Sequence, residues 1–200
     1  MISLDFDIED VCVILSEIND DIFAESLVSL NDSESDYVKS IQSIKRQREV
    51  AVTLFIIKQL FGSDTALEHN ENGKPFLKYS PTHISISHSG NFICIAYSDK
   101  CEVGVDIQFW SNALYRTVDK YLSTNEQQQL DINNKTVLLK SWTAKEAAYK
   151  IFNIKNLSLK DIDTINDDYV VVSVSNLTAI KLSSKTMCFD SYAITLVAKY

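Results

Sequence analysis

"SWTAKEAAYK" (residues 141–150) has the spacing of a helix with two unlike faces. At about 100° per residue, the small apolar side chains gather on one face and the large and charged ones on the other. The second face carries Trp142, Lys145, Glu146, Tyr149 and Lys150. Because alanine side chains let a helix approach a neighbouring layer closely, the stretch predicts a helix packed on a sheet, with its charged face turned elsewhere.

The charged face of this helix has two interpretations. A solvated face with a Glu146–Lys150 pair at i, i+4 would contribute only about 0.3 to 0.5 kcal/mol and carry no function. Trp142 argues against it, because a side chain so large and apolar is rarely left in water. Two lysines that flank a carboxylate also suit a phosphate held beside a divalent cation. We therefore expect this face to be partly covered or to line a cleft.

The stretch "CEVGVDIQFW" (residues 101–110) predicts a strand with one apolar and one polar row. Val103, Val105 and Ile107 would line one side of the strand, and Gly104, Asp106 and Gln108 the other. A solvated sheet face would give the same alternation without any function. The strand by itself therefore leaves both interpretations of Asp106 open.

The segments before this strand predict a helix and a hairpin. Apolar spacing over residues 37–61 predicts a long helix that ends at Gly62. "HISISHSGNFICIAYS" (83–98) alternates on both sides of a Ser-Gly-Asn turn, which predicts a β-hairpin, with 102–108 as the third strand of a meander. Residues 68–82 hold both prolines and predict a long loop with a short extended piece.

The segments after the strand predict a second group of helices and strands. Helices are expected at about 113–122 and 133–152, with a short one between them that the capping-box pattern Ser123-x-x-Glu126 opens. Three strand-like segments complete the chain. Strand and helix groups thus occur twice, a pattern that suggests two structurally similar halves.

Composition restricts the class of protein. A chain of 200 residues that is 46% hydrophobic can bury a sizeable core, and its formal net charge of −8 argues against broad binding to nucleic acid or anionic membranes. The apolar stretches are far too short to span a bilayer, and the N-terminus is acidic where a secretory signal is basic. We expect a cytoplasmic protein whose four scattered cysteines are buried free thiols, neither paired in disulfides nor bound to zinc.

Three further short motifs carry groups that can bind anions. "KRQR" (45–48) concentrates positive charge, "NGKP" (72–75) projects Lys74 from a turn, and "SISHSG" (85–90) places His88 beside Ser87. Both Ser87 and His88 can donate a hydrogen bond to a phosphate oxygen. The alternatives are a surface lysine in a turn and a histidine satisfied at a strand end.

The ordered set "NGKP", "ISISHSG", "GVDIQ" and "WTAKEAAYK" resembles the motifs of the 4'-phosphopantetheinyl transferase superfamily, in its Sfp-like, large single-chain type. The helix motif W-x-x-K-E-A-x-x-K is matched in full, and G-x-D-x-E is matched except at Gln108. These motifs cover residues 72–150, and the basic segment from residue 45 is similar more loosely. The resemblance implies an α+β fold of two pseudo-symmetric halves, residues 1–100 and 101–200, each a small antiparallel sheet packed by a long helix.

The resemblance also implies a reaction and its partners. Such a monomeric enzyme transfers the 4'-phosphopantetheine arm of coenzyme A to a serine of an apo acyl or peptidyl carrier protein and releases 3',5'-ADP. Mg²⁺ would be held by Asp106, Gln108 and Glu146, and Lys150 would neutralise charge on the leaving phosphate, so that Asp106, Glu146 and Lys150 carry the catalysis. The expected contacts to coenzyme A come from Lys74, Ser87, His88, Lys145, Arg46 and Arg48.

Gln108 departs from this pattern, because the commonest residue of the family there is Glu. Its amide oxygen can ligate Mg²⁺, but the site loses one negative charge, which predicts a higher magnesium requirement. The alternative function is a catalytically weakened protein of the same fold that binds coenzyme A or a carrier protein. An unrelated magnesium-dependent phosphohydrolase is disfavoured, because the chain lacks the phosphate-binding pattern G-x-x-x-x-G-K-[ST].

Overall fold

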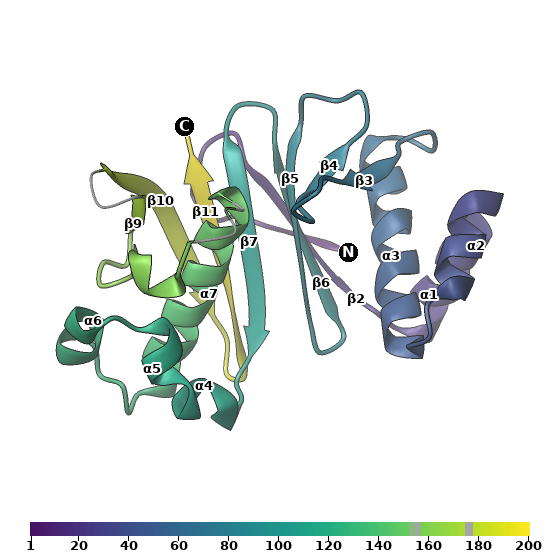
Figure 1. Cartoon of the computed structure of the whole chain (residues 1–200). Coiled ribbons are helices and arrows are strands. Elements are labelled where there is room, and N and C mark those ends of the chain that lie inside the picture. Colours follow the sequence, from purple (N-terminus) through teal and green to yellow (C-terminus); the bar gives the residue numbers. More distant parts are fainter. Residues whose placement is uncertain (153, 155–156, 175–177) are drawn as a thin grey trace.

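The computed structural model describes residues 1–152, 154, 157–174 and 178–200, and these residues form two main antiparallel sheets that lie side by side (Figure 1). The first sheet has the order β1 (Ile2–Leu4), β2 (Cys12–Glu17), β6 (Phe92–Ser98), β5 (His83–Ser89). The second has the order β7 (Glu102–Phe109), β11 (Tyr192–Lys199), β10 (Thr178–Cys188), β9 (Tyr169–Val174), β8 (Ile162–Asp163). The strands of the first sheet therefore all lie before residue 100, and those of the second sheet all lie after it.

The helices flank the sheets in two groups (Figure 1). The first group is α1 (Asp20–Ser29), α2 (Asp32–Ser40) and α3 (Ile44–Phe61). The second is α4 (Asn112–Arg116), α5 (Val118–Tyr121), α6 (Thr124–Gln129), α7 (Lys135–Phe152) and the 3-10 turn η1 (Leu159–Asp161). The predicted α+β class is confirmed, whereas the pseudo-symmetry of the two halves stays a prediction.

The long helix predicted over residues 37–61 is interrupted. The helix α2 ends at Ser40 and α3 begins at Ile44, because the side chain of Ser43 accepts a hydrogen bond from the backbone N–H of Arg46 and caps the new helix. Gly62 ends α3 with φ of 104°, in agreement with the prediction. The acidic stretch at residues 31–36 opens α2, with a capping box between Asn31 and Glu34.

The predicted hairpin is confirmed as β5 and β6, and the loop 68–82 contains a small hairpin of β3 (Leu67–His69) and β4 (Pro75–Leu77). The third strand of the meander is a wrong prediction, because β7 pairs with β11 in the second sheet. Between β5 and β7, serine hydroxyls replace the backbone ladder. The backbone N–H groups of Val105, Ile107 and Phe109 donate to Ser85, Ser87 and Ser89 at 3.0, 3.2 and 3.1 Å. We call Ser85, Ser87 and Ser89 the serine seam.

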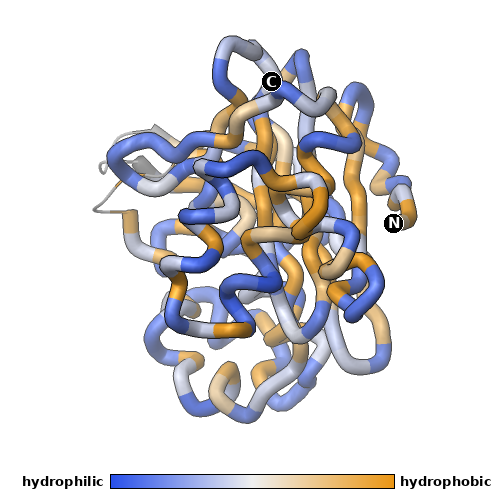
Figure 2. The backbone as a smooth tube through the Cα atoms, turned by 90° about the vertical axis from the view of Figure 1, so that its right-hand side faces the viewer, coloured by the Kyte–Doolittle hydropathy of each residue, from blue (hydrophilic) through white to orange (hydrophobic). Residues whose placement is uncertain are grey.

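The helix α7 packs on the second sheet as the alanine face predicted. Ala147 and Ala148 are fully buried, and a Cβ atom on Gly104 would lie 1.9 Å from the carbonyl oxygen of Ala147. Only glycine therefore fits at this position of β7. One core cluster joins the two sheets through β2, β6, β7 and β11. Figure 2 shows hydrophobic and hydrophilic segments alternating along the backbone.

Two further predictions concern the whole chain. All four cysteines are free; Cys94 and Cys101 are buried as predicted, whereas the prediction of burial is wrong for the exposed Cys12 and Cys188. Within the described ranges, none of the helices combines the length and the apolar character that a membrane crossing requires.

Candidate active site

Asp106 lies at the centre of the candidate site, on β7 beside the seam. Its side chain is 9% exposed, and its Oδ1 accepts hydrogen bonds from Ser87 Oγ at 2.7 Å and from Lys150 Nζ at 2.8 Å. Its Oδ2 is buried and has no hydrogen-bond partner among the described residues. Such an acceptor costs free energy unless a ligand or water satisfies it, so this oxygen is a candidate binding position.

The helix α7 brings Glu146 and Lys150 to Asp106, one helical turn apart on the same face. Lys150 also donates to the carbonyl oxygen of Val105 at 2.8 Å, which fixes its ammonium group between helix and strand. Burial raises the pKa of the half-buried Glu146, and the nearby Asp106 carboxylate raises it further, while Lys150 opposes both effects. The strand aspartate and the helix glutamate are thus electrostatically coupled.

Gln108 follows Asp106 on the same face of β7. Its amide nitrogen donates to the carbonyl oxygen of Phe109 at 2.9 Å, so the amide oxygen is the atom of this side chain that could bind a metal. The carboxylates of Asp106, with its unsatisfied Oδ2, and of Glu146 and the amide oxygen of Gln108 are oxygen donors that suit Mg²⁺. Within the part of the chain that the structure describes, no three His, Cys, Asp or Glu side chains group together. A metal here would therefore depend on additional oxygens from its substrate.

His88 lies on β5, on the other side of the seam from Gln108. Thr53 donates its hydroxyl proton to the carbonyl oxygen of Glu49 at 2.7 Å and lies 3.0 Å from His88 Nε2. Because that proton is committed, the ring donates through Nε2–H, and Nδ1 carries the lone pair of the neutral form. Burial lowers the pKa of His88 to about 4; Glu49 opposes this shift, and Arg46 and Lys150 add to it. His88 is therefore neutral at pH 7.

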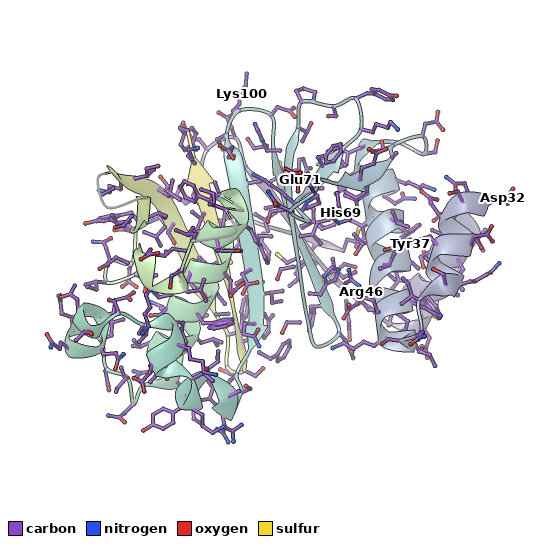
Figure 3. The ribbon with its side chains drawn as sticks, viewed as in Figure 1. Asp32, Tyr37, Arg46, His69, Glu71 and Lys100 are labelled. Atoms are coloured by element: carbon purple, nitrogen blue, oxygen red, sulfur yellow. The ribbon has the colours of Figure 1, made fainter. Side chains whose placement is uncertain are left out.

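A cavity of about 600 Å³ adjoins His88 and is walled by α2, α3, β5 and the β3–β4 hairpin. Arg46, His69 and Thr53 supply polar groups to it, and Tyr37 closes it on the α2 side. Figure 3 shows Tyr37, Arg46 and His69 in this part of the molecule. The predicted basic segment reaches the cavity through Arg46, which lines it. Arg46 also donates to the carboxylate of Glu49 at 3.0 Å.

Two other predicted anion ligands are engaged elsewhere. Arg48 pairs with Asp20 at 2.8 Å and lies over the ring of Phe23, away from the cavity that Arg46 lines. Lys74 donates to Glu102 at 3.2 Å and to the carbonyl oxygen of Ile151 at 2.8 Å. Lys74 thus ties the loop before β4 to the C-terminal end of α7, and it borders a smaller cavity of about 140 Å³ that Lys150 also lines.

Lys145 corrects the prediction of one charged helix face. Its side chain is 0% exposed, and its ammonium group pairs with Glu126 at 2.7 Å and donates to the carbonyl oxygens of Leu159, at 3.0 Å, and Ile162. Burial lowers the pKa of Lys145, and Glu126 opposes that shift. Lys145 therefore fastens α6 and η1 to α7 and does not face a ligand. A helical wheel could not show this, because the packing of α6 decides which part of the face stays open.

Glu49 and Thr53 were missed by the sequence analysis. Their spacing of four on α3 places them on one face, but a charge and a hydroxyl at that spacing are common on helices that bind nothing. The contact between Thr53 and His88 joins residues 35 positions apart and follows from the packing of α3 on β5. No local pattern indicates such a contact.

Two comparisons with known proteins concern this same region. Residues 102–197 match the family model of the 4'-phosphopantetheinyl transferase superfamily. A Haemophilus influenzae protein named "Putative 4'-phosphopantetheinyl transferase" is 25% identical over 160 residues, which cover 72% of this chain and 66% of that protein. The matched residues 102–197 hold Asp106, Gln108, Glu146 and Lys150. The half of the chain that carries the carboxylates is thus similar to the 4'-phosphopantetheinyl transferase superfamily.

Proposed function

We propose that the protein transfers the 4'-phosphopantetheine arm of coenzyme A to a serine of an apo acyl or peptidyl carrier protein, with Mg²⁺, and releases 3',5'-ADP. One observation carries the proposal. Asp106 has a buried, unsatisfied Oδ2, pairs with Lys150 through its Oδ1 and lies close enough to Glu146 to raise the pKa of that carboxyl, in a region that matches the superfamily. Superfamily and relative both support phosphopantetheine transfer in general; the metal, donor and acceptor are the finer part of the proposal.

Asp106 and Glu146 would hold Mg²⁺, with Gln108 contributing its amide oxygen. The metal would neutralise charge on the diphosphate of coenzyme A as the bond to the leaving phosphate breaks. Lys150 already lies at 2.8 Å from Asp106, so it carries a positive charge in the same place and would stabilise the negative charge of the leaving 3',5'-ADP.

The transfer requires one proton acceptor. A new bond forms between the serine oxygen and the phosphorus of phosphopantetheine, the diphosphate P–O bond breaks, and the serine proton must leave. Glu146 is our candidate for this acceptor, because it is a half-buried carboxylate close to Asp106, where the serine would approach the diphosphate. A water molecule in the site remains the alternative acceptor.

The cavity at His88 would hold the phosphorylated nucleotide end of coenzyme A. Its volume of about 600 Å³ lies in the range of small-molecule sites, and Arg46 brings a permanent positive charge to its wall. His88 is neutral without a ligand, and its Nδ1 could donate to a phosphate only after protonation. A bound phosphate would favour that protonation, because a nearby anion raises the pKa of a histidine.

The proposal is tested by incubation of the protein with coenzyme A, Mg²⁺ and a panel of apo carrier proteins, followed by intact-mass measurement. We expect at least one carrier to gain the mass of one phosphopantetheine group, and chelation of the metal to abolish the gain. Binding of coenzyme A without transfer to any carrier of the panel would favour the catalytically weakened protein. A monomeric state and a cytoplasmic location are further parts of the proposal.

A further inference from the structure

The serine seam offers three similar side chains for comparison. Ser85, Ser87 and Ser89 alternate along β5, so their hydroxyl groups lie in one row, and each accepts one backbone N–H from β7. These bonds replace a backbone ladder between the two sheets. All three serines therefore have a structural role, which is to hold β5 and β7 in register.

Ser87 makes one further hydrogen bond, to Asp106. Ser85 and Ser89 make no hydrogen bond to Asp106 in the described structure. The hydroxyl of Ser87 donates to Asp106 Oδ1 at 2.7 Å while it accepts from the N–H of Ile107 at 3.2 Å. A serine hydroxyl has a single proton, so the contact with Asp106 uses its only donor. With Lys150 on the same oxygen, Oδ1 has two donors and Oδ2 has none among the described residues.

We propose that Ser87 is a positioning residue for the metal site, which acts by fixing the carboxylate of Asp106 so that Oδ2 is presented to Mg²⁺. This inference rests on the proposed function for the identity of the metal. It replaces the expectation that Ser87 binds a phosphate of coenzyme A, because Ser87 is 5% exposed and its donor is already used. The two halves are thereby coupled: a residue of the first sheet orients a ligand that belongs to the second.

The loss of the hydroxyl would leave Lys150 as the single donor to Asp106. The carboxylate could then rotate and offer either oxygen to the ammonium group, so that Lys150 would compete with the metal for the same charge. Hydrogen-bond partners that orient a metal ligand typically change metal affinity by about 10- to 100-fold when they are removed.

The test compares Ser87→Ala with Ser85→Ala. Ser85 is the matched control, because it is 3% exposed, accepts the same kind of backbone bond and does not touch Asp106 in the described structure. The dissociation constant of Mn²⁺ is measured by electron paramagnetic resonance in the presence of coenzyme A, and thermal unfolding is followed on the same samples. We expect both variants to lose similar stability, and Ser87→Ala alone to weaken Mn²⁺ binding by roughly tenfold.

Ser87→Thr keeps the hydroxyl and is expected to restore Mn²⁺ binding to within about twofold of the original protein. Equal Mn²⁺ affinities of Ser87→Ala and Ser85→Ala would overturn the inference. So would an original protein that binds no Mn²⁺, and this outcome would remove the metal assignment as well. Should Ser87→Ala not fold, Ser87→Cys and Ser85→Cys take its place, since a thiol is a weak donor of similar size.

Failure of this inference differs from failure of the proposed function. A protein whose Mn²⁺ affinity depends on Ser87 but that modifies no carrier keeps the inference and loses the proposed transfer. A protein that modifies a carrier with unchanged Mn²⁺ affinity in Ser87→Ala keeps the transfer and loses the inference.

Discussion

The two long helices α3 and α7 have eighteen residues each, and each packs on its own sheet, but they bring different functional groups to the site. The helix α7 and its strand β7 supply the carboxylates of Glu146 and Asp106. The helix α3 and its strand β5 supply Arg46 and His88. We call the carboxylates of Asp106 and Glu146 the cation end of the site, and the cavity at His88 with Arg46 its anion end, because a metal-bound diphosphate and a phosphorylated nucleotide would need groups of these two kinds.

Side-chain size at the two helix–sheet contacts explains part of this difference. The helix α7 meets β7 through Ala147 and Gly104, with a glycine where even a methyl group would overlap the helix backbone. The helix α3 packs through the larger Val52, Ile56 and Ile57. Larger side chains favour a wider separation. The close approach of α7 lets Lys150 reach the carboxylate of Asp106 on the strand. Beside α3, where the side chains are larger, the structure has a cavity of about 600 Å³.

We expect the largest effect from a substitution of Asp106, at the cation end of the site. Asp106→Asn removes the charge that the metal and Lys150 share, and we expect the rate of phosphopantetheine transfer to fall by roughly 1000-fold, the upper range for loss of one preorganised electrostatic contact. The measurement is the rate of carrier modification by mass. Unchanged circular dichroism serves as the control, and a variant with more than a tenth of the original rate would contradict the metal assignment.

The next effect concerns the close contact of α7. Gly104→Ala places a methyl group 1.9 Å from the Ala147 carbonyl oxygen, so the helix must shift. We expect a loss of about 3 kcal/mol in the free energy of unfolding, measured in urea. Gly73→Ala is a control with open space around its Cβ and only a strained φ of 82°, and it should lose about 1 kcal/mol.

His88, at the anion end of the site, makes the stability of the folded protein depend on pH. Its pKa is about 4 in the folded protein against an ordinary value of 6.5, so the unfolded chain binds the proton first as the pH falls. The contribution of His88 to stability is therefore complete above pH 6.5 and is lost between pH 6.5 and 4, by at most about 3 kcal/mol. Urea unfolding of His88→Gln at pH 7 and pH 5 should show a smaller difference than the original protein; an equal difference would refute this assignment.

Variants of Arg46 and Arg48 test whether coenzyme A binds in the cavity or on the outer surface of α3, because of the two only Arg46 lines the cavity. Arg46→Ala should raise the KM for coenzyme A by about tenfold with little change in kcat, because a charge-assisted contact made to bound substrate and transition state alike is lost. Arg48→Ala removes the same charge two residues away, and we expect less than a twofold change, since Arg48 pairs with Asp20. Equal effects of both variants would place the nucleotide end elsewhere.

The smallest effect concerns Gln108. Gln108→Glu restores a carboxylate beside Asp106 and should lower the half-saturating concentration of Mg²⁺ by roughly threefold to tenfold, because an additional negative ligand strengthens binding of a hard cation. A magnesium titration of the transfer rate measures this. Equal half-saturation in the two proteins would remove Gln108 from the metal site.

Local patterns in the amino-acid sequence determined many features of this protein by themselves. Alternation placed Asp106 and Gln108 on one face of a strand, the Ser123–Glu126 capping box opened a short helix, and Gly62 ended a long one. These features depend on neighbours within a few residues, because backbone period, caps and turns are short-range properties.

Only the tertiary structure decided which of the candidate groups meet. It paired β7 with β11, buried Lys145 against Glu126, and joined Ser87 to Asp106 across the seam. Each of these contacts joins residues that are far apart in the chain, so it depends on how helices and sheets pack together. Residue type and spacing determine which chemistry is available to the protein, whereas packing determines which groups come within hydrogen-bonding distance.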